Sequence, residues 1–257
     1  GAVDKMLPDR TISDAKRVVH DQVEFNKGCP KETHPTAVQP FHRQVARQIL
    51  WWKSRYPGIP VWLAKRDVNG AFRLLWLAPG DVETFSTTLP WSPQAMAPEE
   101  GKRAAHAAAG AKLLLFYLVL SFGWSGSPGE WTVWALAIIQ FMEHFRPSMG
   151  YRDGPERFKV WALVDDGVMV EPLLGLRPWI ASNLYEEGAR RCLGPDAMNH
   201  EKNVLEGSWA TRKTVWGIDM HTSDGTATLP EKRILKGALL LAEPVFDTGN
   251  KRITLLD

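Results

Sequence analysis

Cysteine is scarce in this sequence. Only Cys29 and Cys192 occur among its 257 residues, a number typical of a protein in a reducing, intracellular setting. Cys29 stands near His34 and His42, but the three residues lack the paired spacing of a zinc site, which argues against zinc binding there. We therefore expect an intracellular protein, in the cytoplasm or the nucleus.

Long apolar runs and internal repeats are also missing. The longest apolar run, LLLFYLVL at residues 113–120, is too short to cross a bilayer, which takes about 20 residues. It predicts a buried strand or a short core helix, and no membrane partner is expected. No internal repeat appears in the sequence. The net charge of +2 permits a nucleic-acid partner without requiring one.

The sequence does contain enough apolar material for a sizeable core. Hydrophobic residues make up 44% of the chain and charged residues 23%, a globular balance that argues against global disorder. The length allows one large domain or two modest ones. Twelve tryptophans supply flat stacking surface, most of which we expect in the core.

Helical and extended patterns follow one another without strict alternation. Apolar spacing predicts helices over residues 40–58, 131–145 and 178–194, and a helical tail after Pro230. Extended patterns predict a strand over 59–68, two strands folded back on each other over 157–174, and short strands over 203–207, 213–222 and 225–230. Residues 78–111 predict a long loop with a short alanine-rich helix. Together these favour an α+β fold, with an antiparallel sheet and helices on one face.

Two adjacent aspartates interrupt an apolar segment. In WALVDDGVMVEP, residues 161–172, Asp165 and Asp166 stand where the two strands are predicted to turn. Like charges repel, and burying either carboxylate unpaired costs several kcal/mol or raises its pKa. A divalent cation removes both problems, because hard oxygen ligands suit Mg²⁺. The alternative is a solvated turn that happens to be acidic.

A third carboxylate favours the metal site over the acidic turn. Asp67 also ends an apolar segment. If the strands that end at Asp67 and Asp165 lie side by side, three carboxylates meet at one edge of the sheet. Such a set can hold two Mg²⁺ ions about 4 Å apart, which activate an attacking hydroxyl and neutralise a leaving pyrophosphate.

Six segments then resemble, in order, the fingers and palm motifs of reverse transcriptases of the retrotransposon type. They are RTISDAK (10–16), DVNGAF (67–72), LSFGWSGSP (120–128), LVDDGVMV (163–170), HEKNVLEG (200–207) and VWGIDMHT (215–222). The resemblance covers roughly residues 10 to 234 and implies an RNA-directed DNA polymerase core that adds deoxynucleotides to a primer 3′-hydroxyl. The departures are Leu163, where an aromatic residue is usual, and the insertion at 78–111.

The resemblance also implies a right-hand domain organisation. It assigns residues 1–59 and 78–122 to the fingers and residues 60–77 and 123–234 to the palm. Residues 235–257 would begin a thumb or connection, so that the thumb is largely absent and the chain is part of a longer polyprotein. The implied partners are an RNA or DNA template with its primer and deoxynucleoside triphosphates. The implied cofactor is Mg²⁺, two ions, with Mn²⁺ as a substitute.

Site residues follow from the resemblance, motif by motif. Catalysis is assigned to Asp67, Asp165, Asp166 and Lys202, the last as a proton donor near the pyrophosphate. The metal ligands would be the three aspartates and the backbone carbonyl of Val68. The nucleotide would be bound by Arg10, Val68, Phe72, Phe122 and Gly123. The primer end would be held by Trp216, Gly217 and Ile218.

Two of these assignments have a plain physical reason. Arg10 would clamp the triphosphate, because the planar guanidinium fork binds phosphate oxygens bidentately. Asp14 and Lys16 would brace the Arg10 segment, and Lys5 is a candidate for a second basic residue. The ring of Phe72 would sit beneath the incoming sugar and leave no room for a 2′-hydroxyl.

Two alternatives from other classes stay open. One is a catalytically silent polymerase-fold scaffold, or a nucleic-acid-binding subunit of a larger complex. The other is a different palm enzyme, such as an RNA-templated RNA polymerase or a nucleotide cyclase. Phe72 argues against ribonucleotide use, and the presence of all three aspartates argues against a silent scaffold.

Overall fold

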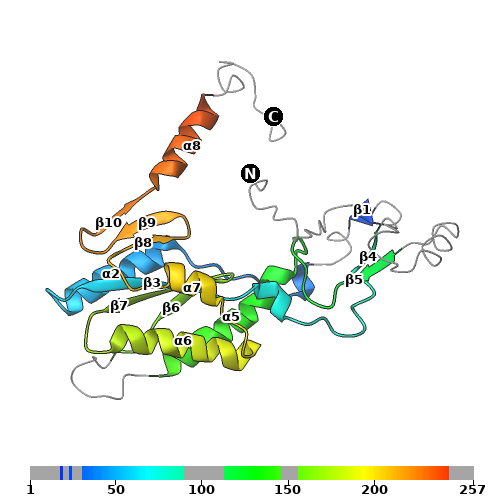
Figure 1. The fold of residues 1–257 in the computed structure, drawn as a ribbon, viewed down its shortest axis with the longest axis horizontal. Coiled ribbons are helices and arrows are strands. Elements are labelled where there is room, and N and C mark those ends of the chain that lie inside the picture. Colours follow the sequence, from blue (N-terminus) through cyan, green and yellow to red (C-terminus); the bar gives the residue numbers. More distant parts are fainter. Residues whose placement is uncertain (1–17, 20–22, 25–30, 90–112, 146–155, 243–257) are drawn as a thin grey trace. The chain divides into compact units, whose positions relative to one another are not determined.

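A computed structural model of the chain describes residues 18–19, 23–24, 31–89, 113–145 and 156–242 (Figure 1). The chain divides into two compact units. The first comprises residues 1–37 and 70–133, and the second comprises residues 38–69 and 134–257. Each unit is therefore assembled from two separate stretches of the sequence.

A three-stranded antiparallel sheet forms the centre of the second unit. Its strand order is β3 (Val61–Asp67), β7 (Asp166–Pro172) and β6 (Val160–Leu163). β3 pairs with β7 along its whole length, from Val61 opposite Pro172 to Asp67 opposite Asp166. The α+β class and the antiparallel pairing predicted from the sequence are confirmed.

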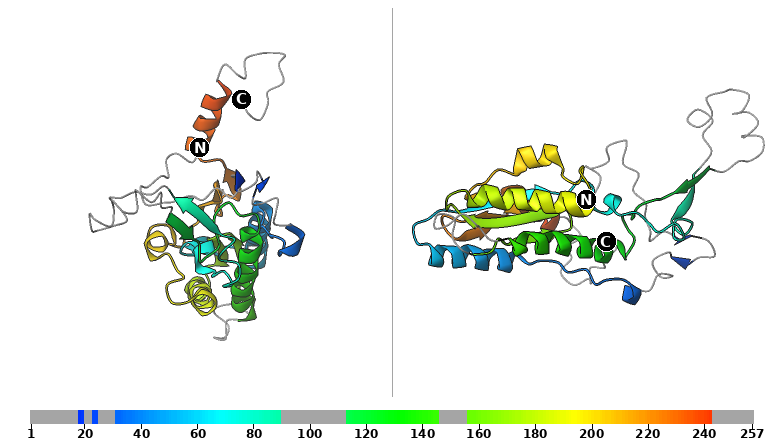
Figure 2. Two further views of the ribbon diagram at one scale, coloured as in Figure 1. Left: turned by 90° about the vertical axis from the view of Figure 1, so that its right-hand side faces the viewer. Right: turned by 90° about the horizontal axis from the view of Figure 1, so that it is seen from below.

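Helices cover both faces of this sheet, and not one face as the sequence predicted. α2 (His42–Arg55) and α6 (Arg177–Leu193) lie on opposite sides of it, as the turned views also show (Figure 2). The reason lies in β7, where every residue from 167 to 172 is buried. A strand that is buried on both faces needs cover on both faces.

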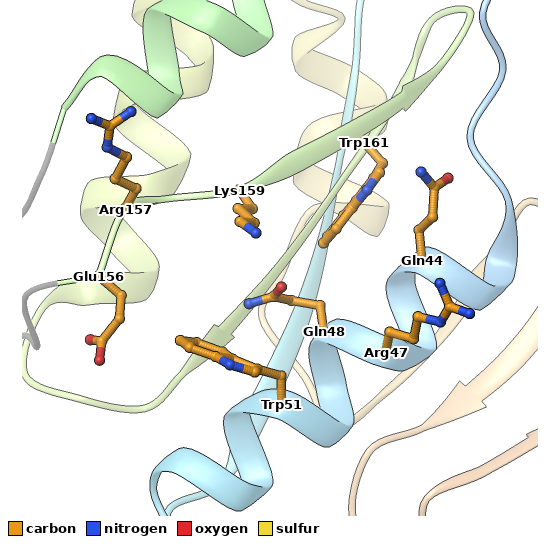
Figure 3. A pocket seen from close by; sticks show the side chains of 8 residues that line it. All are labelled: Gln44, Arg47, Gln48, Trp51, Glu156, Arg157, Lys159 and Trp161. Atoms are coloured by element: carbon orange, nitrogen blue, oxygen red, sulfur yellow. The ribbon is translucent and has the colours of Figure 1, made fainter.

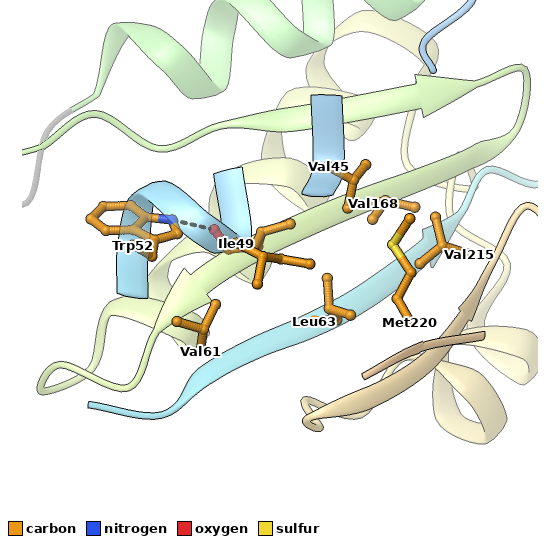
Figure 4. Close-up of a cluster of buried hydrophobic side chains, with 9 residues drawn as sticks. Val45, Ile49, Trp52, Val61, Leu63, Val168, Val215 and Met220 are labelled. Atoms are coloured by element: carbon orange, nitrogen blue, oxygen red, sulfur yellow. Dashed lines mark hydrogen bonds between the residues drawn. The ribbon is translucent and has the colours of Figure 1, made fainter. Parts of the chain in front are cut away.

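The face under α2 holds the main hydrophobic core (Figure 4). Alternate strand residues point to this side, because successive side chains in a strand face opposite ways. The Trp52 indole Nε1 donates a hydrogen bond of 2.8 Å to the carbonyl of Val170. The buried members of the cluster are Val45, Ile49, Trp52, Val61, Leu63, Val168, Val170, Val215 and Met220.

The opposite face is closed by α6 and the second half of α5 (Ser127–His144). A side chain at Gly167 of β7 would come within 2.5 Å of the Tyr185 ring, so α6 lies directly on the strand there. Gly188 allows the same close approach to Phe141 of α5.

A second small sheet completes the second unit. It contains β8 (Arg212–Val215), β9 (Ile218–His221) and β10 (Thr226–Thr228), with β9 in the middle. α7 (His200–Glu206) precedes it and α8 (Glu231–Leu241) follows. The strand predicted over 203–207 is therefore wrong, because residues 203–206 form the end of α7 and Gly207 is its C-cap. The Asn199 side chain caps the first turn of α7 by accepting a hydrogen bond from the Lys202 amide.

The first unit contains short elements. β1 (Val18–Val19) pairs with β2 (Val23–Glu24), and β4 (Ser86–Leu89) pairs with β5 (Leu113–Phe116). Two 3₁₀ turns, η2 (Lys31–Thr33) and η3 (Ala71–Leu74), belong to the same unit. The apolar run at 113–120 does begin as a strand, but Phe116 and Leu118 are about half exposed, which corrects the expectation of a wholly buried strand. None of the helices in the described ranges combines the length and apolar character needed to span a membrane.

A buried arginine joins several segments of the second unit. The Arg177 guanidinium donates through Nε to the carboxylate of Glu171, and through Nη1 and Nη2 to the carbonyls of Glu156 (2.8 Å) and Arg157 (3.0 Å). It also lies over the Trp52 ring, 4.7 Å from the ring centre. Burial raises the pKa of Glu171 to about 7, against the attraction of Arg177.

We predict that Arg177→Met lowers the free energy of unfolding by about 3–5 kcal/mol at pH 8, because it leaves Glu171 buried without its cation. The folded-state pKa of Glu171 lies above its unfolded value of 4.5. The folded state therefore holds the proton more tightly, and stability falls as the pH rises from 4.5 through about 7. Without Arg177 this pKa rises further, so the deficit of the variant should shrink toward pH 5.

Urea unfolding at pH 5 and pH 8 measures both effects. Arg191→Met is the matched control on the same helix, since Arg191 is exposed and pairs with Glu187. It should cost about 1 kcal/mol or less at either pH. Equal losses in the two variants would contradict the role assigned to Arg177.

Candidate active site

The three aspartates singled out in the sequence lie at one end of the central sheet. Asp67 is the last residue of β3 and Asp166 the first residue of β7, and the two are direct partners across the strand pair. Asp165 stands in the turn immediately before Asp166, and its carbonyl accepts a 3.0 Å hydrogen bond from the Val68 amide. Residues about 100 positions apart in the sequence are thus neighbours, as the motif argument required.

The turn between β6 and β7 consists of Val164 and Asp165, because Leu163 and Asp166 already pair. Val164 has a φ of 53°, in the left-handed region where a β-branched residue is strained. A two-residue hairpin with a positive φ at its first position normally carries glycine there. The backbone that presents Asp165 is therefore held in a costly conformation by the strands on either side.

A second segment supports Asp67 from the other side. The Asn203 side-chain oxygen accepts a 2.9 Å hydrogen bond from the Asp67 amide, and the Asn199 amide donates to the Asp67 carbonyl at 3.0 Å. The Lys202 Nζ lies 2.7 Å from Asp67 Oδ1. One turn of α7 thus fixes both the backbone and the carboxylate of Asp67.

The electrostatics reflect crowded negative charge. Burial raises the pKa of Asp166, the charges of Asp165 and Asp67 raise it further, and Lys65 and Lys202 act against them. For Lys202, burial lowers the pKa, but its hydrogen bond to Asp67 and the charges of the three aspartates outweigh burial and raise it. Lys202 is therefore a firmly protonated counter-ion at this end of the sheet.

Among the described residues, no group of three or more histidine, cysteine, aspartate or glutamate side chains is arranged to hold a metal ion. In this conformation the Lys202 ammonium is bound to Asp67, and the assignment of the three aspartates as a set of metal ligands stays a prediction. The chemistry of the donors does fit a divalent cation. All three are hard carboxylates, and a cation would favour the charged form of Asp166, whose pKa is raised first by burial and then by the charges of Asp165 and Asp67.

The predicted primer residues lie next to the aspartates. Trp216 and Gly217 form the turn between β8 and β9, with φ values of 44° and 86°. The Trp216 indole Nε1 donates to the carbonyl of Asp166 at 3.4 Å. Ile218 packs against the main core. The φ of Gly217 lies in the left-handed region that favours glycine, and the Arg233 guanidinium lies beside it at the end of a flexible side chain.

The predicted nucleotide residues are divided between the units. Val68 belongs to the second unit and is fully buried. Phe72 and Phe122 belong to the first unit, where their rings are in contact with centres 5.2 Å apart. Gly123 follows them with a φ of 93°. Arg10, with its neighbours Lys5, Asp14 and Lys16, lies outside the described residues.

Asn199 and Asn203 are the site residues that sequence reasoning missed. Both bind the backbone of Asp67, and neither was distinguished from ordinary polar residues. A signal was present for Asn199, because asparagine just before HEKNVLE is a typical helix N-cap. No such signal marked Asn203, whose partner is far away in the sequence.

Comparison with known proteins finds similarity among solved structures. No protein-family model matches the sequence, and no curated protein matches it. Among solved structures, the apo telomerase from Candida tropicalis truncated from its C-terminal domain is similar over 75% of this chain and 40% of its own, with 14% identity and a TM-score of 0.41.

A second similar structure is telomerase from Candida albicans in complex with the TWJ fragment of telomeric RNA. The similarity covers 82% of this chain and 39% of the telomerase chain, with 15% identity and a TM-score of 0.45. A third, apo telomerase from Candida tropicalis, covers 79% and 38%, with 13% identity and a TM-score of 0.41. The chain thus spans about two fifths of the length of these structures, and its function is inferred from its own residues.

We predict that Asn203→Ala lowers the free energy of unfolding by about 1–3 kcal/mol, because the Asp67 amide loses its acceptor. Chemical unfolding of the two proteins measures the difference. Asn183→Ala, at an exposed position on α6, is the control and should change stability by less than about 0.5 kcal/mol. A loss in the control as large as that in Asn203→Ala would show that the Asp67 contact is not the cause.

Proposed function

We propose that the chain carries the fingers and palm of a reverse-transcriptase-like polymerase of retrotransposon type and transfers deoxynucleotides to a primer 3′-hydroxyl on an RNA or DNA template. The observation that carries the proposal is the register of β3 and β7, which pairs Asp67 with Asp166 and sets Asp165 beside them. The six ordered motifs support it, because this pairing joins two of them that are distant in the sequence.

In this proposal Asp67, Asp165, Asp166 and the carbonyl of Val68 hold two Mg²⁺ ions. The bound ions would activate the primer hydroxyl and neutralise charge on the leaving pyrophosphate. The protein's own contribution is to position the groups: β3, β7 and α7 fix the backbone of Asp67, and the β6–β7 turn fixes that of Asp165.

Lys202 has two roles in the proposal. Without a metal it neutralises Asp67, as its 2.7 Å contact supports. With Asp67 engaged by Mg²⁺, the Lys202 ammonium would be freed to donate a proton to the leaving pyrophosphate. Burial lowers the pKa of Lys202, but its hydrogen bond to Asp67 outweighs burial and raises it, so the side chain starts in the protonated form that this role requires.

The nucleotide and primer roles follow the resemblance. Phe72, in contact with Phe122, would exclude the 2′-hydroxyl of a ribonucleotide, and Gly123 would let the backbone approach the nucleotide. Arg10 would bind the triphosphate. Trp216, Gly217 and Ile218 would hold the primer end, which the hydrogen bond from Trp216 to Asp166 supports.

A second candidate is a silent polymerase-fold module that binds nucleic acid within a larger complex. The observation that favours it is the state of the aspartates, because Asp67 is neutralised by Lys202 and no three-carboxylate group is formed in the part of the chain that is described. A measurement of primer extension distinguishes the polymerase from the silent module.

The deciding test is primer extension with Mg²⁺ on annealed RNA and DNA templates. We predict that the parent extends the primer and that Asp165→Asn reduces the rate at least about a hundredfold, because a ligand charge is lost with little change of shape. Replacing Mg²⁺ with Ca²⁺ should retain template–primer binding and stop extension.

The matched control is Asp224→Asn, at an exposed position after β9, which should extend as the parent does. Equal extension by the parent and Asp165→Asn would contradict the catalytic assignment. Binding of template–primer with no extension by the parent would favour the silent module.

Phe72 separates a DNA polymerase from a ribonucleotide-using palm enzyme. We predict that Phe72→Leu increases incorporation of ribonucleotides relative to deoxynucleotides, because a smaller side chain leaves room for the 2′-hydroxyl. Competition between the two nucleotide types in single-nucleotide extension measures the ratio. Phe145→Leu, at a half-exposed position at the end of α5, is the control, and a parent that already prefers ribonucleotides would overturn the assignment.

A further inference from the structure

A pocket of about 650 Å³ lies in the second unit between α2 and the segment that leads into β6 (Figure 3). Its size is in the range of small-ligand sites. Its described lining includes none of the residues proposed for catalysis, nucleotide binding or primer binding. The lining consists of Gln44, Arg47, Gln48 and Trp51 from α2, and Glu156, Arg157, Lys159 and Trp161 from the other side.

The pocket carries an excess of positive charge. Arg47, Arg157 and Lys159 form no ion pair with a carboxylate of any residue in the described ranges. Among the described lining residues Glu156 is the acidic one, and it is already engaged, since it accepts hydrogen bonds from Arg55 Nε (3.0 Å) and Tyr56 Oη (2.6 Å). Three cations without a described carboxylate partner therefore line the pocket.

Gln48 is the most informative residue of the pocket. Its side chain is 8% exposed, and its amide has no hydrogen-bond partner within the described parts of the chain. Figure 3 shows it directed into the space between Trp51 and Trp161. The amide nitrogen and oxygen of Gln48 are not among the fully buried unpaired atoms of the described residues, so they are open to the pocket, where a ligand with a donor and an acceptor edge can pair with them.

Two tryptophans supply stacking surface. Trp51 is 45% exposed, and it meets the buried Trp52 edge to face, with ring centres 4.6 Å apart. Trp161 packs against the main core from β6 and reaches the pocket from the opposite side. Exposed aromatic rings with cations around them are the arrangement that proteins use to stack bases and hold phosphates.

We propose that this pocket binds single-stranded nucleic acid through a base–phosphate unit. The base stacks on Trp51, its polar edge pairs with the Gln48 amide, and the flanking phosphates contact Arg47, Arg157 and Lys159. The site is separate from the three aspartates and does not depend on the proposed polymerase activity. A free nucleotide carries the same chemistry, and competition distinguishes it from a strand.

The test uses the 257-residue chain and fluorescein-labelled 12-nucleotide RNA and DNA of mixed sequence with a single 5-iodouridine. Fluorescence anisotropy should show Trp51→Ala binding about fivefold to a hundredfold more weakly than the parent, the loss expected for one stacked base. Arg47→Ala combined with Lys159→Ala should flatten the salt dependence of binding by about 0.7 per lost phosphate contact. Light-induced cross-links should map to peptides that contain Trp51 or Trp161.

Trp179→Ala is the matched control, because Trp179 is 47% exposed on α6; its binding should equal that of the parent. Equal weakening in both tryptophan variants, or cross-links confined to other peptides, overturns the proposal. So does polyphosphate that competes as well as the oligonucleotide, since bases would then contribute nothing. If AMP at the same nucleotide concentration competes as well as the oligonucleotide, the pocket binds a free nucleotide and the proposal of a single strand is wrong.

Two further measurements keep the outcomes distinct. Trp51→Phe, which retains an aromatic face, should recover most of the binding, whereas a general folding defect would not be rescued this way. Asp165→Asn should cross-link at the pocket like the parent. Failure of primer extension with intact pocket cross-linking therefore overturns only the polymerase proposal, and the reverse result overturns only the pocket.

Discussion

The pairing of β3 with β7 is the constraint on which the second unit depends. It runs the full length of β3 and places Asp67 opposite Asp166 at one end. A slip of one residue would turn every side chain of a strand to the other face. Val168 and Val170 would then leave the core under α2, and Gly167 would no longer lie beneath Tyr185. The packing on both faces thus selects the register that brings the acidic residues together.

The elements with strong local patterns were predictable from the sequence. The helix now seen at His42–Arg55 was indicated by its apolar spacing, and the β6–β7 hairpin by two apolar runs around Asp165 and Asp166. The sequence predicts a strand over residues 203–207, because the apolar residues of so short a segment do not distinguish the helical periodicity from that of a strand. The contacts of α7 with Asp67, which fix its position, are invisible to local pattern.

The residues of the site were predictable from the sequence, but the contacts between them were less so. The three aspartates could be named from the motifs, but not the contact of Lys202 with Asp67, because it joins side chains 135 positions apart. The pocket beside β6 was not predicted at all. Its lining comes from two segments that carry no motif, and the signals that identify it are an amide of Gln48 that faces the pocket unpaired and the exposure of Trp51, neither of which can be obtained from sequence.

β6 connects the pocket to the site of the three aspartates. Trp161 is part of the pocket wall and also packs on the main core, and the same strand leads within four residues to Asp165. The segment of the pocket wall that precedes Trp161 is held in place because the carbonyls of Glu156 and Arg157 accept hydrogen bonds from the buried Arg177. Both regions therefore rest on the same rigid scaffold of core, strand and buried guanidinium, which is the usual requirement for precise binding geometry.

The turn at Val164 has a consequence for how this chain could be altered. Glycine at this position would adopt the same backbone without strain and would gain stability locally. The β-branched residue restricts the alternative conformations of the loop more than glycine would. At the hairpin tip, higher stability and a rigid acidic turn therefore favour different residues. Selection for heat resistance alone would favour glycine at position 164, which makes the turn more flexible.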